Sequence, residues 1–382
     1  MSNLTSKKVL EIYKKNNPSD SYNLKKNLKI RANIISRKLN FPLRFFKGLN
    51  ICDFACGTGD NAIIYGLNKA NVKGFDFNSE SIKISKKRIK NLNLKNIKFT
   101  VADFYKIRGK YDFVSSTAAI HHLENPLKGL NHLKQRVKND GFLFVSFGLR
   151  TSNIQHALMK IAVRKFGQKD QQIYKVSKKL FPNHIKRCVF YGLRKESNVI
   201  YDQFVNPQHN YLNLNQVLKT LGKNFILHSS WPKIFIPSGD SAMNDTLENY
   251  QFNKFFLSEL YWSQKNQDDK TIINNTKSAN YEKAFYDLSN LLNNQNNFKY
   301  FMNLKFEKTY DIIDSLINDP IDTNYNLDKS FKLFVKEIKI FMKSIKNDNL
   351  SQMSNKIKTF DKLFKGTSGL GLNYFIFQKK ER

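Results

Sequence analysis

Short apolar runs alternate with amphipathic stretches along residues 49–148, a pattern that predicts a parallel sheet covered by helices. Short apolar runs predict strands at 49–54, 71–77, 96–103, 111–118 and 142–148. Amphipathic stretches between them predict helices at 60–69, 79–92 and 126–138. Ser79 or Ser81 is expected to cap the second helix, and Asn139, Asp140 and Gly141 to end the third. A regular succession of this kind is typical of an α/β fold.

The rest of the chain has a different pattern. Residues 1–48 are basic and predicted to be helical, and they are expected to cover the site. Two or three helices are expected at 152–200, a helix at 212–222, a sixth strand at 225–231, and a mostly helical block at 245–365. The tail at 372–378, after the turn at 366–371, is strand-like.

We favour the interpretation that this tail returns as a seventh strand beside 225–231, which makes the helical block an insertion. The alternative is a separate helical C-terminal domain. The expected division is a helical cap at 1–48, an α/β domain at 49–240 with an insertion at about 150–210, a helical region at 241–365 that shapes the substrate site, and a final strand within 366–382.

Composition narrows the protein class. With 41% hydrophobic and 13% aromatic residues among 382, the chain can form a packed core, which excludes wholesale disorder. No apolar run reaches the ~18 residues of a membrane span, and no apolar signal core stands at the N-terminus. The three cysteines, Cys52, Cys56 and Cys188, do not indicate a disulfide framework. We therefore expect a cytoplasmic protein without a membrane span.

A net charge of +33 raises the question of a nucleic-acid partner. Only 11 of the 64 basic residues are arginine, the side chain best suited to bidentate base and phosphate contacts. The abundance of lysine together with asparagine, isoleucine, phenylalanine and tyrosine is typical of an AT-rich coding sequence. We favour compositional drift, and a surface for an anionic partner remains the alternative.

The candidate chemistry begins in the segment DFACGTGD at 53–60, between a predicted strand and helix. Gly57 and Gly59 allow close approach of a ligand, and the helix N-terminus offers free N–H groups. Asp53, at the end of an apolar strand, is costly to bury unless a ligand uses it. Asp76 and Asp103 end the next two strands, at the edge where open α/β sheets bind ligands.

These motifs resemble the class I S-adenosylmethionine-dependent methyltransferases over roughly 49–148. DFACGTGD is similar to the glycine-rich first motif of the family, with Ala55 in place of the usual first glycine. GFDFN is similar to the second motif, VADF to the third, YDFVSSTAAIHHLENP to the fourth, and VKNDGFLFVSF to the fifth strand region. The resemblance implies a Rossmann-like, mostly parallel sheet of seven strands with helices on both faces, together with large helical additions.

The resemblance also implies that the methyl donor S-adenosylmethionine is the cofactor. Asp76 would bind the ribose hydroxyls, Asp103 the adenine amino group, and Thr117 and Ala118 would lie near the reacting end. The residues expected to bind the cofactor are Asp53, Ala55, Cys56, Gly57, Gly59, Asp76, Phe77, Asp103, Phe104 and Thr117.

A rival interpretation is a dinucleotide site, because GTGDNA at 57–62 also fits the G-x-G-x-x-A fingerprint. That site would place a pyrophosphate beside Asp53, which would repel it. S-adenosylmethionine has no phosphate and carries a cationic ammonium and sulfonium, so electrostatics favours the methyl donor.

Methyl transfer requires a positioned nucleophile and, for some acceptors, a base. His121 and His122 follow the fourth strand and are the candidate bases; the alternative is that they pack or contact the cofactor. Tyr65 and Tyr211 are interpreted as core residues rather than pocket residues. Cys56 is interpreted as a small turn residue, and no Cys/His spacing indicates a metal site.

The acceptor is the least determined feature. A small metabolite or an envelope-precursor glycan is favoured, with a protein side chain or a transfer RNA as alternatives. A non-catalytic cofactor-binding scaffold is an alternative of another class. The segments 202–211 and 237–245 are candidates for shaping the acceptor pocket.

Overall fold

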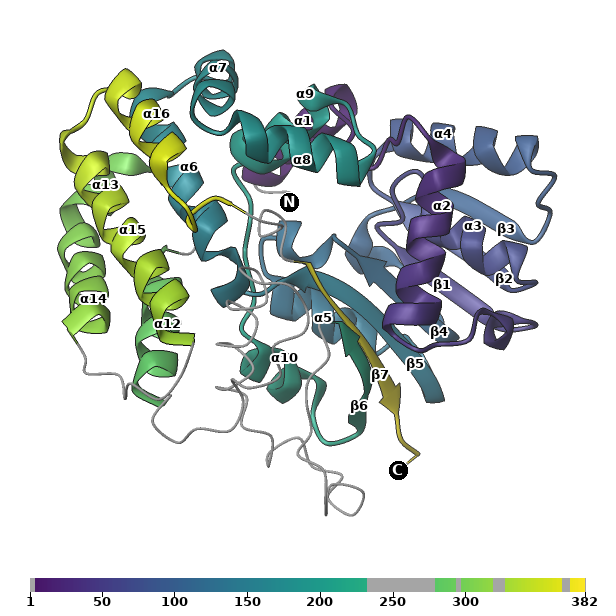
Figure 1. Ribbon diagram of the computed structural model, residues 1–382. Coiled ribbons are helices and arrows are strands. Elements are labelled where there is room, and N and C mark those ends of the chain that lie inside the picture. The colour runs from purple at the N-terminus through teal and green to yellow at the C-terminus, as the bar shows by residue number, and fades with distance from the viewer. Residues whose placement is uncertain (1–3, 232–278, 293–296, 319–326, 366–371, 382) are drawn as a thin grey trace.

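The computed structural model describes residues 4–231, 279–292, 297–318, 327–365 and 372–381 (Figure 1). One sheet of seven strands runs through the described residues in the order β3-β2-β1-β4-β5-β7-β6. The strands are β1 (Asn50–Phe54), β2 (Asn71–Asp76), β3 (Ile97–Val101), β4 (Tyr111–Thr117), β5 (Val137–Gly148), β6 (Phe225–Trp231) and β7 (Leu372–Lys379). The seven expected strands are therefore present, and the fold class is confirmed.

The last strand, β7, lies between β5 and β6 and runs antiparallel to both. Phe144 pairs with Ile376 on one side, and Leu227 pairs with Phe377 on the other. The tail thus enters the sheet beside 225–231, as the favoured interpretation expected. The turn at 366–371 and the candidate loop at 237–245 lie outside the described residues.

Helices cover both faces of the sheet. They are α2 (Leu24–Asn33), α3 (Asp60–Leu67), α4 (Ser79–Asn91), α5 (Pro126–Lys134) and α10 (Leu214–Leu221). Ile63 of α3 and Ile82 of α4 are buried in the core on one face. Leu130 of α5 and Val217 of α10 are buried in the core on the other face. This burial on both faces explains why the central strands β1, β4 and β5 are almost continuously buried, whereas β2 and β3, toward one edge of the sheet, alternate buried and exposed residues.

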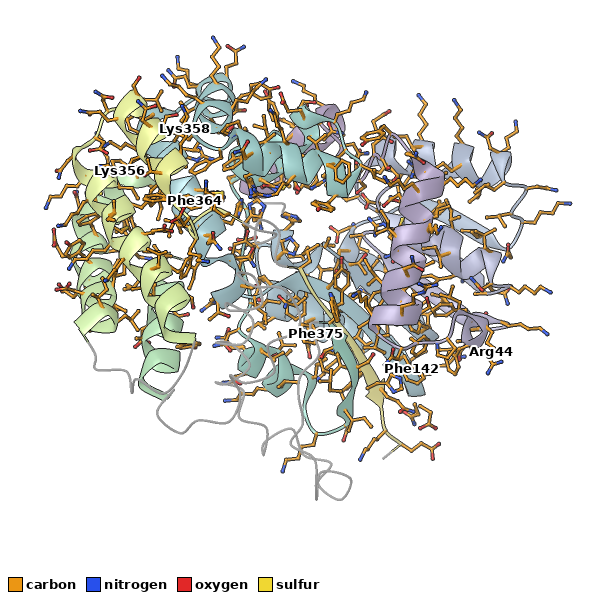
Figure 2. The ribbon with its side chains drawn as sticks, in the orientation of Figure 1. Arg44, Phe142, Lys356, Lys358, Phe364 and Phe375 are labelled. Carbon is orange, nitrogen blue, oxygen red and sulfur yellow. The ribbon has the colours of Figure 1, made fainter. Side chains whose placement is uncertain are left out.

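A further core lies beside the sheet and is built by helices and the turn that follows the last of them. The helices are α1 (Leu4–Lys15), α6 (Ile154–Phe166), α7 (Asp170–Leu180), α8 (Pro182–Gly192), α9 (Glu196–Ile200), α12 (Ala279–Leu292), α13 (Phe298–Leu304), α14 (Phe306–Asn318), α15 (Leu327–Asn347) and α16 (Leu350–Thr359). Ile161, Phe341 and Phe364 are buried in it, and Figure 2 shows Phe364 well apart from Phe375 of the sheet. Helices that follow β5 and helices that precede β7 therefore share one core.

Short helical turns join these elements. Two are single π-helical turns, η1 (Ile34–Lys38) and η6 (Tyr201–Val205). The others are 3-10 turns, namely η2 (Leu43–Phe46), η3 (Phe104–Lys106), η4 (Ile120–His122) and η5 (Thr151–Asn153). Residues of η4 and η6 line the cavity described below, so these two turns help to form the site.

The structure corrects three local expectations. The helix expected at 126–138 ends at Lys134, and Val137 already belongs to β5, where it is fully buried and pairs with Tyr111. A buried β-branched side chain favours the strand, and Asp140 is accommodated within β5 at a φ of 56°. The segment 152–200 contains four helices instead of two or three.

The third correction concerns the start of α4. Neither Ser79 nor Ser81 caps this helix. Asn78 is the capping residue, and its side chain accepts a hydrogen bond from the Glu80 N–H. Ser81 instead accepts a hydrogen bond from Asn17 of the N-terminal segment, at 2.9 Å. The short Asn side chain at the last extended residue satisfies a free N–H group of the first turn.

Among the described residues, the helices are each too short or too polar to cross a membrane.

Candidate active site

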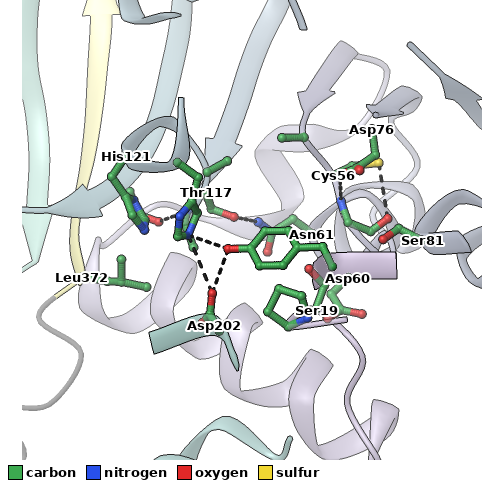
Figure 3. A pocket seen from close by; sticks show the side chains of 18 of the residues that line it. Ser19, Cys56, Asp60, Asn61, Asp76, Ser81, Thr117, His121, Asp202 and Leu372 are labelled. Atoms are coloured by element: carbon green, nitrogen blue, oxygen red, sulfur yellow. Dashed lines mark hydrogen bonds and ion pairs between the residues drawn. The ribbon is translucent and has the colours of Figure 1, made fainter. Parts of the chain in front are cut away.

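A cavity of about 420 Å³ lies at the carboxyl ends of β1, β2 and β4 and extends toward α1 and α8 (Figure 3). One end, the glycine-turn end, is lined by Ala55, Cys56, Gly57, Asp76 and Phe77. The other end, the histidine end, is lined by His121, His122, His156, Asp202, His209 and Tyr211. The cavity therefore joins the predicted cofactor motifs to the predicted histidines.

The turn after β1 needs small residues for two separate reasons. Its backbone is left-handed at Ala55, Gly57 and Gly59, with φ values of 50°, 55° and 83°. A Cβ on Gly57 would lie 2.4 Å from Oγ of Ser19, and one on Gly59 would lie 2.5 Å from the Phe99 ring. Glycine is thus required at both positions, whereas Ala55 tolerates its strained conformation at some cost.

Asp76 ends β2 with its carboxylate directed at the glycine turn. One oxygen accepts the Gly57 N–H and the other accepts the Asn78 N–H, each at 2.8 Å. Burial raises the pKa of this carboxyl, and the backbone hydrogen bonds oppose the rise. Each oxygen keeps a lone pair, so the carboxylate can still accept hydroxyls from a ligand in the cavity. The ring of Phe77, which lines the cavity beside Asp76, is half exposed.

Asp53 lies beneath the glycine turn and does not line the cavity. Burial raises its pKa from 3.8 to about 7, while a hydrogen bond with Ser115 and the charge of Arg31 oppose the rise. The carboxyl therefore changes charge near neutral pH. A cationic group bound above it would favour the ionised form.

The ten residues expected to bind the cofactor divide into two groups. The cavity is lined by Ala55, Cys56, Gly57, Asp76, Phe77, Phe104 and Thr117. Asp53, Gly59 and Asp103 are not among the lining residues. Asp103 caps η3 by accepting the Tyr105 N–H at 2.8 Å. Gly59 serves as the residue before α3.

Part of the N-terminal segment lies over the glycine turn. The Thr58 hydroxyl donates to the backbone carbonyl of Ser19 at 2.8 Å, and the Asn78 side chain donates to the carbonyl of Tyr13 at 3.1 Å. Tyr13, Asn17 and Ser19 all line the cavity. These bonds fix α1 above the turn, so Tyr13 reaches the histidine end.

Thr117 marks the boundary between the two ends. Its hydroxyl accepts a 2.6 Å hydrogen bond from the Asn61 side chain, which in turn accepts one from Arg31 at 3.3 Å. Ala118, the next residue, has a φ of 53° and donates its N–H to Oγ of Ser146 at 2.9 Å. The end of β4 is therefore held rigidly where the two ends meet.

His122 is oriented by a backbone carbonyl. Its Nδ1 lies 3.0 Å from the carbonyl oxygen of Gln208, which can only accept, so Nδ1 carries the hydrogen. In the neutral ring Nε2 then holds a free lone pair. This atom lies 3.3 Å from the Tyr13 hydroxyl and 3.9 Å from Oδ1 of Asp202 (Figure 3). His122 thus presents an acceptor nitrogen beside a carboxylate.

Asp202 organises the polar groups around that nitrogen. Its Oδ1 accepts the Tyr13 hydroxyl at 2.9 Å, and its Oδ2 accepts Nη1 of Arg194 at 3.0 Å. The Asn206 amide donates to the Tyr13 oxygen at 2.8 Å. Burial and Asp202 raise the pKa of Tyr13 well above its usual value, so this phenol remains protonated.

The two predicted histidines differ in basicity. Burial lowers the pKa of His121 well below its usual value, and the neighbouring His122 and His156 lower it further. Burial also lowers the pKa of His122, but the charge of Asp202 and the hydrogen bond to Gln208 oppose the effect. At the histidine end, His122 is therefore the better proton acceptor of the pair.

The tyrosines give mixed outcomes. Tyr65 is a core residue, as interpreted: it is fully buried and donates to Ser115 at 3.0 Å. Tyr211 lines the cavity, and its hydroxyl lies 2.5 Å from Nδ1 of His156. Interpreting Tyr211 as a core residue was therefore wrong. Its ring is buried and also lines the cavity. In a sequence with many tyrosines, the residue type alone does not distinguish a core position from a pocket position.

Sequence reasoning missed Tyr13, Asp202, His156 and His209 as individual site residues. The segment 202–211 was a candidate because it precedes the helix expected at 212–222, where enzymes of the resembled family place substrate-facing elements. Nothing in the sequence around Tyr13 indicated a site residue, because the position of Tyr13 depends on where α1 packs.

The chain matches the sequence model of the family described as "Methyltransferase domain" over residues 45–277, more than half of its length. The chain belongs to this family. It contains a class I S-adenosylmethionine-dependent methyltransferase domain, as the resemblance implied, and the rival dinucleotide interpretation is set aside.

A curated relative is the mitochondrial ubiquinone biosynthesis O-methyltransferase of Dictyostelium discoideum, which is 29% identical over 133 residues. The match covers 31% of this chain and 40% of the length of that protein.

Two solved structures are also similar. The magnesium protoporphyrin IX methyltransferase of Synechocystis PCC 6803, solved with bound S-adenosylmethionine, has a TM-score of 0.33 at 18% identity, covering 38% of this chain and 77% of that one. TehB of Haemophilus influenzae has a TM-score of 0.26 at 21% identity, covering 31% and 45%. At these scores neither structure contributes to the argument for function.

The glycine-turn end of the methyltransferase fits its cofactor. The Asp76 carboxylate suits a pair of ribose hydroxyls, and Phe77 offers an apolar ring surface for a base. A buried carboxyl at Asp53 suits a cationic ligand and would disfavour a pyrophosphate.

Proposed function

We propose that this methyltransferase transfers the methyl group of S-adenosylmethionine to a small-molecule acceptor bound at the histidine end. The burial of that end carries the proposal. His121, Asp202, His209 and Tyr211 are each at most 8% exposed, yet all line the cavity. A compact molecule suits such a site better than a protein side chain or a nucleotide, which would have to leave its own surroundings to enter it. The volume is typical of small-molecule sites.

The cofactor is assigned to the glycine-turn end. Asp76 would accept the ribose hydroxyls, Gly57 would contact the cofactor through its backbone, and Phe77 would pack against the adenine. S-adenosylmethionine supplies the methyl group on a sulfonium, which makes that carbon open to in-line attack. Thr117 and Ala118 stand where the two ends meet and would border the reacting atoms.

His122 is assigned as the residue that accepts the acceptor's proton. The Gln208 carbonyl fixes the ring so that Nε2 is the free nitrogen. When Nε2 takes the proton, the resulting imidazolium lies 3.9 Å from Asp202, which stabilises it. Tyr13 and Arg194 hold the carboxylate in place. His121, whose pKa is lowered more strongly, is assigned to packing against His122.

A hydroxyl acceptor fits this arrangement best. An alcohol or phenol must lose a proton as the new oxygen–carbon bond forms, and His122 provides the base. The relative from Dictyostelium discoideum is named an O-methyltransferase, which supports the same choice. The N-terminal segment is assigned as a cap over the cofactor, and the helices after β5 as the wall of the acceptor site.

Transfer of labelled methyl from S-adenosylmethionine into a fractionated lysate tests the proposal. We expect the purified enzyme to label the small-molecule pool, and mass spectrometry then identifies the product. Label confined to acid-insoluble material would contradict the proposal, and protease and nuclease treatment would then distinguish a protein from an RNA acceptor. Binding of S-adenosylhomocysteine without labelling of any fraction would favour a non-catalytic scaffold.

A further inference from the structure

Three potential metal ligands meet at the histidine end, although they come from distant parts of the chain. His122 ends η4, Asp202 lies in η6, and His209 follows in the loop before α10. One ligand atom from each lies within 4.8 Å of the other two. We propose that His122, Asp202 and His209 form a binding site for one divalent transition-metal cation.

The donor set suits such a cation. Two imidazoles and one carboxylate form a set that transition metals such as Zn²⁺, Co²⁺ and Fe²⁺ bind, whereas Mg²⁺ and Ca²⁺ prefer oxygen ligands alone. All three side chains line the cavity, so a bound cation would keep open positions toward a ligand.

Outer contacts already orient two of the ligands. The Gln208 carbonyl accepts Nδ1–H of His122 at 3.0 Å, which leaves Nε2 as the donor atom. Arg194 binds Oδ2 of Asp202 at 3.0 Å and leaves Oδ1 directed at His122. Hydrogen bonds of this kind, from a ligand to a carbonyl or a neighbouring side chain, orient the ligands of known metal sites.

The Tyr13 hydroxyl lies beside two of the proposed ligand atoms. Its oxygen is 2.9 Å from Oδ1 of Asp202 and 3.3 Å from Nε2 of His122. Adjacent ligands about 2.1 Å from a metal are ~3.0 to 3.4 Å apart in octahedral or tetrahedral geometry. Nε2 of His122 and Oδ1 of Asp202 are 3.9 Å apart, so they would move closer together by about 0.5 Å to bind one cation. Lys160 donates to the Asn206 carbonyl and approaches Nδ1 of His209 at 3.4 Å, and its charge also interacts with that of Asp202.

The cation and a proton would compete for the same atom, Nε2 of His122. Nε2 has a single lone pair, so a bound cation would prevent this nitrogen from taking the acceptor's proton. This consequence for turnover rests on the proposed function, in which His122 is the base. The binding of the cation does not rest on it.

Titration of the chelator-treated full chain with Co²⁺ and with Zn²⁺ tests the site, using calorimetry and the visible absorption of bound Co²⁺. We expect one cation per chain, and we expect His209→Gln to weaken its affinity by ~100-fold or more. His156→Gln, which alters a buried histidine of the same cavity outside the three ligands, is the matched control and should retain the affinity. Circular dichroism confirms that both variants are folded.

Two results would overturn the site: no saturable binding of either cation, or equal affinity in His209→Gln and the parent. Both measurements omit methyl donor and acceptor, so their outcome is independent of the proposed function. With an acceptor in hand, Zn²⁺ should reduce turnover of the parent and a chelator should restore it. Turnover that rises with Zn²⁺ would contradict the competition at Nε2.

Discussion

The two ends of the cavity are built in different ways. The glycine-turn end comes from short consecutive stretches, residues 55–57 after β1 and 76–77 at the end of β2, whose strands are neighbours in the sheet. The histidine end gathers side chains from α1, η4, α6 and the segment 202–211. The glycine-turn end is therefore formed by short sequence motifs that the family model can detect. The histidine end depends on how helices that are distant in the sequence pack together. We therefore expect cofactor binding and acceptor chemistry to respond to different substitutions.

The largest expected effect is on stability and concerns Asp53, beneath the glycine turn. Its pKa is raised from 3.8 to about 7, so the folded protein binds this proton more tightly than the unfolded chain. The stabilisation is complete below pH 3.8 and is lost as pH rises toward 7. Asp53→Asn should therefore equal the parent near pH 4 and exceed its free energy of unfolding by up to ~4 kcal/mol at pH 8.

Chemical denaturation across pH 4 to 8 measures this difference. Asp112→Asn is the control, because the Asp112 pKa is lowered by its hydrogen bond with Lys138 and its pH dependence has the opposite sign. A pH-independent difference between Asp53→Asn and the parent would show that Asp53 is ionised throughout.

The next largest effect separates the two ends. His122→Gln should reduce turnover by ~100-fold or more, because it removes the assigned base. The control is His228→Gln, on the edge strand β6 outside the cavity lining. Rates of labelled methyl transfer measure both variants. A rate within a few-fold of the parent in His122→Gln would assign this histidine to packing alone.

Asp76→Asn tests the opposite end. Losing charged hydrogen bonds to the ribose should weaken S-adenosylhomocysteine binding by ~1–3 kcal/mol. Asp112→Asn, at the far end of β4, should bind as the parent does. Calorimetry measures both variants. Unchanged affinity in Asp76→Asn would contradict the assignment of Asp76 as the residue that binds the ribose hydroxyls.

The smallest effect tests the contribution of the N-terminal segment. Tyr13→Phe removes the hydrogen bond to Asp202, and with it part of the support for that carboxylate. We expect turnover to fall about 5- to 10-fold, which corresponds to ~1 kcal/mol. Tyr174→Phe, which loses a comparable bond to Glu196 away from the cavity, is the control. Equal rates in the two variants would indicate that Tyr13 only packs over the site.

The same contrast explains what could be predicted from the sequence. The apolar runs predicted all seven strands, and the signal is clearest for the central strands β1, β4 and β5, which are buried on both faces. They placed the start of β5 too late, because Asn139, Asp140 and Gly141 look like a helix end although the strand continues through them. Tyr13 and Asp202 could not be paired in advance. They are 189 residues apart, and only the packing of α1 brings them together.

Binding of S-adenosylhomocysteine to His122→Gln, measured beside the parent and Asp76→Asn, tests most directly whether the two ends act separately. It requires no knowledge of the acceptor. We predict that His122→Gln binds within about twofold of the parent, a difference of ~0.4 kcal/mol, while Asp76→Asn is clearly weaker. An equal loss of affinity in His122→Gln and Asp76→Asn would contradict the division, because both ends would then bind the cofactor.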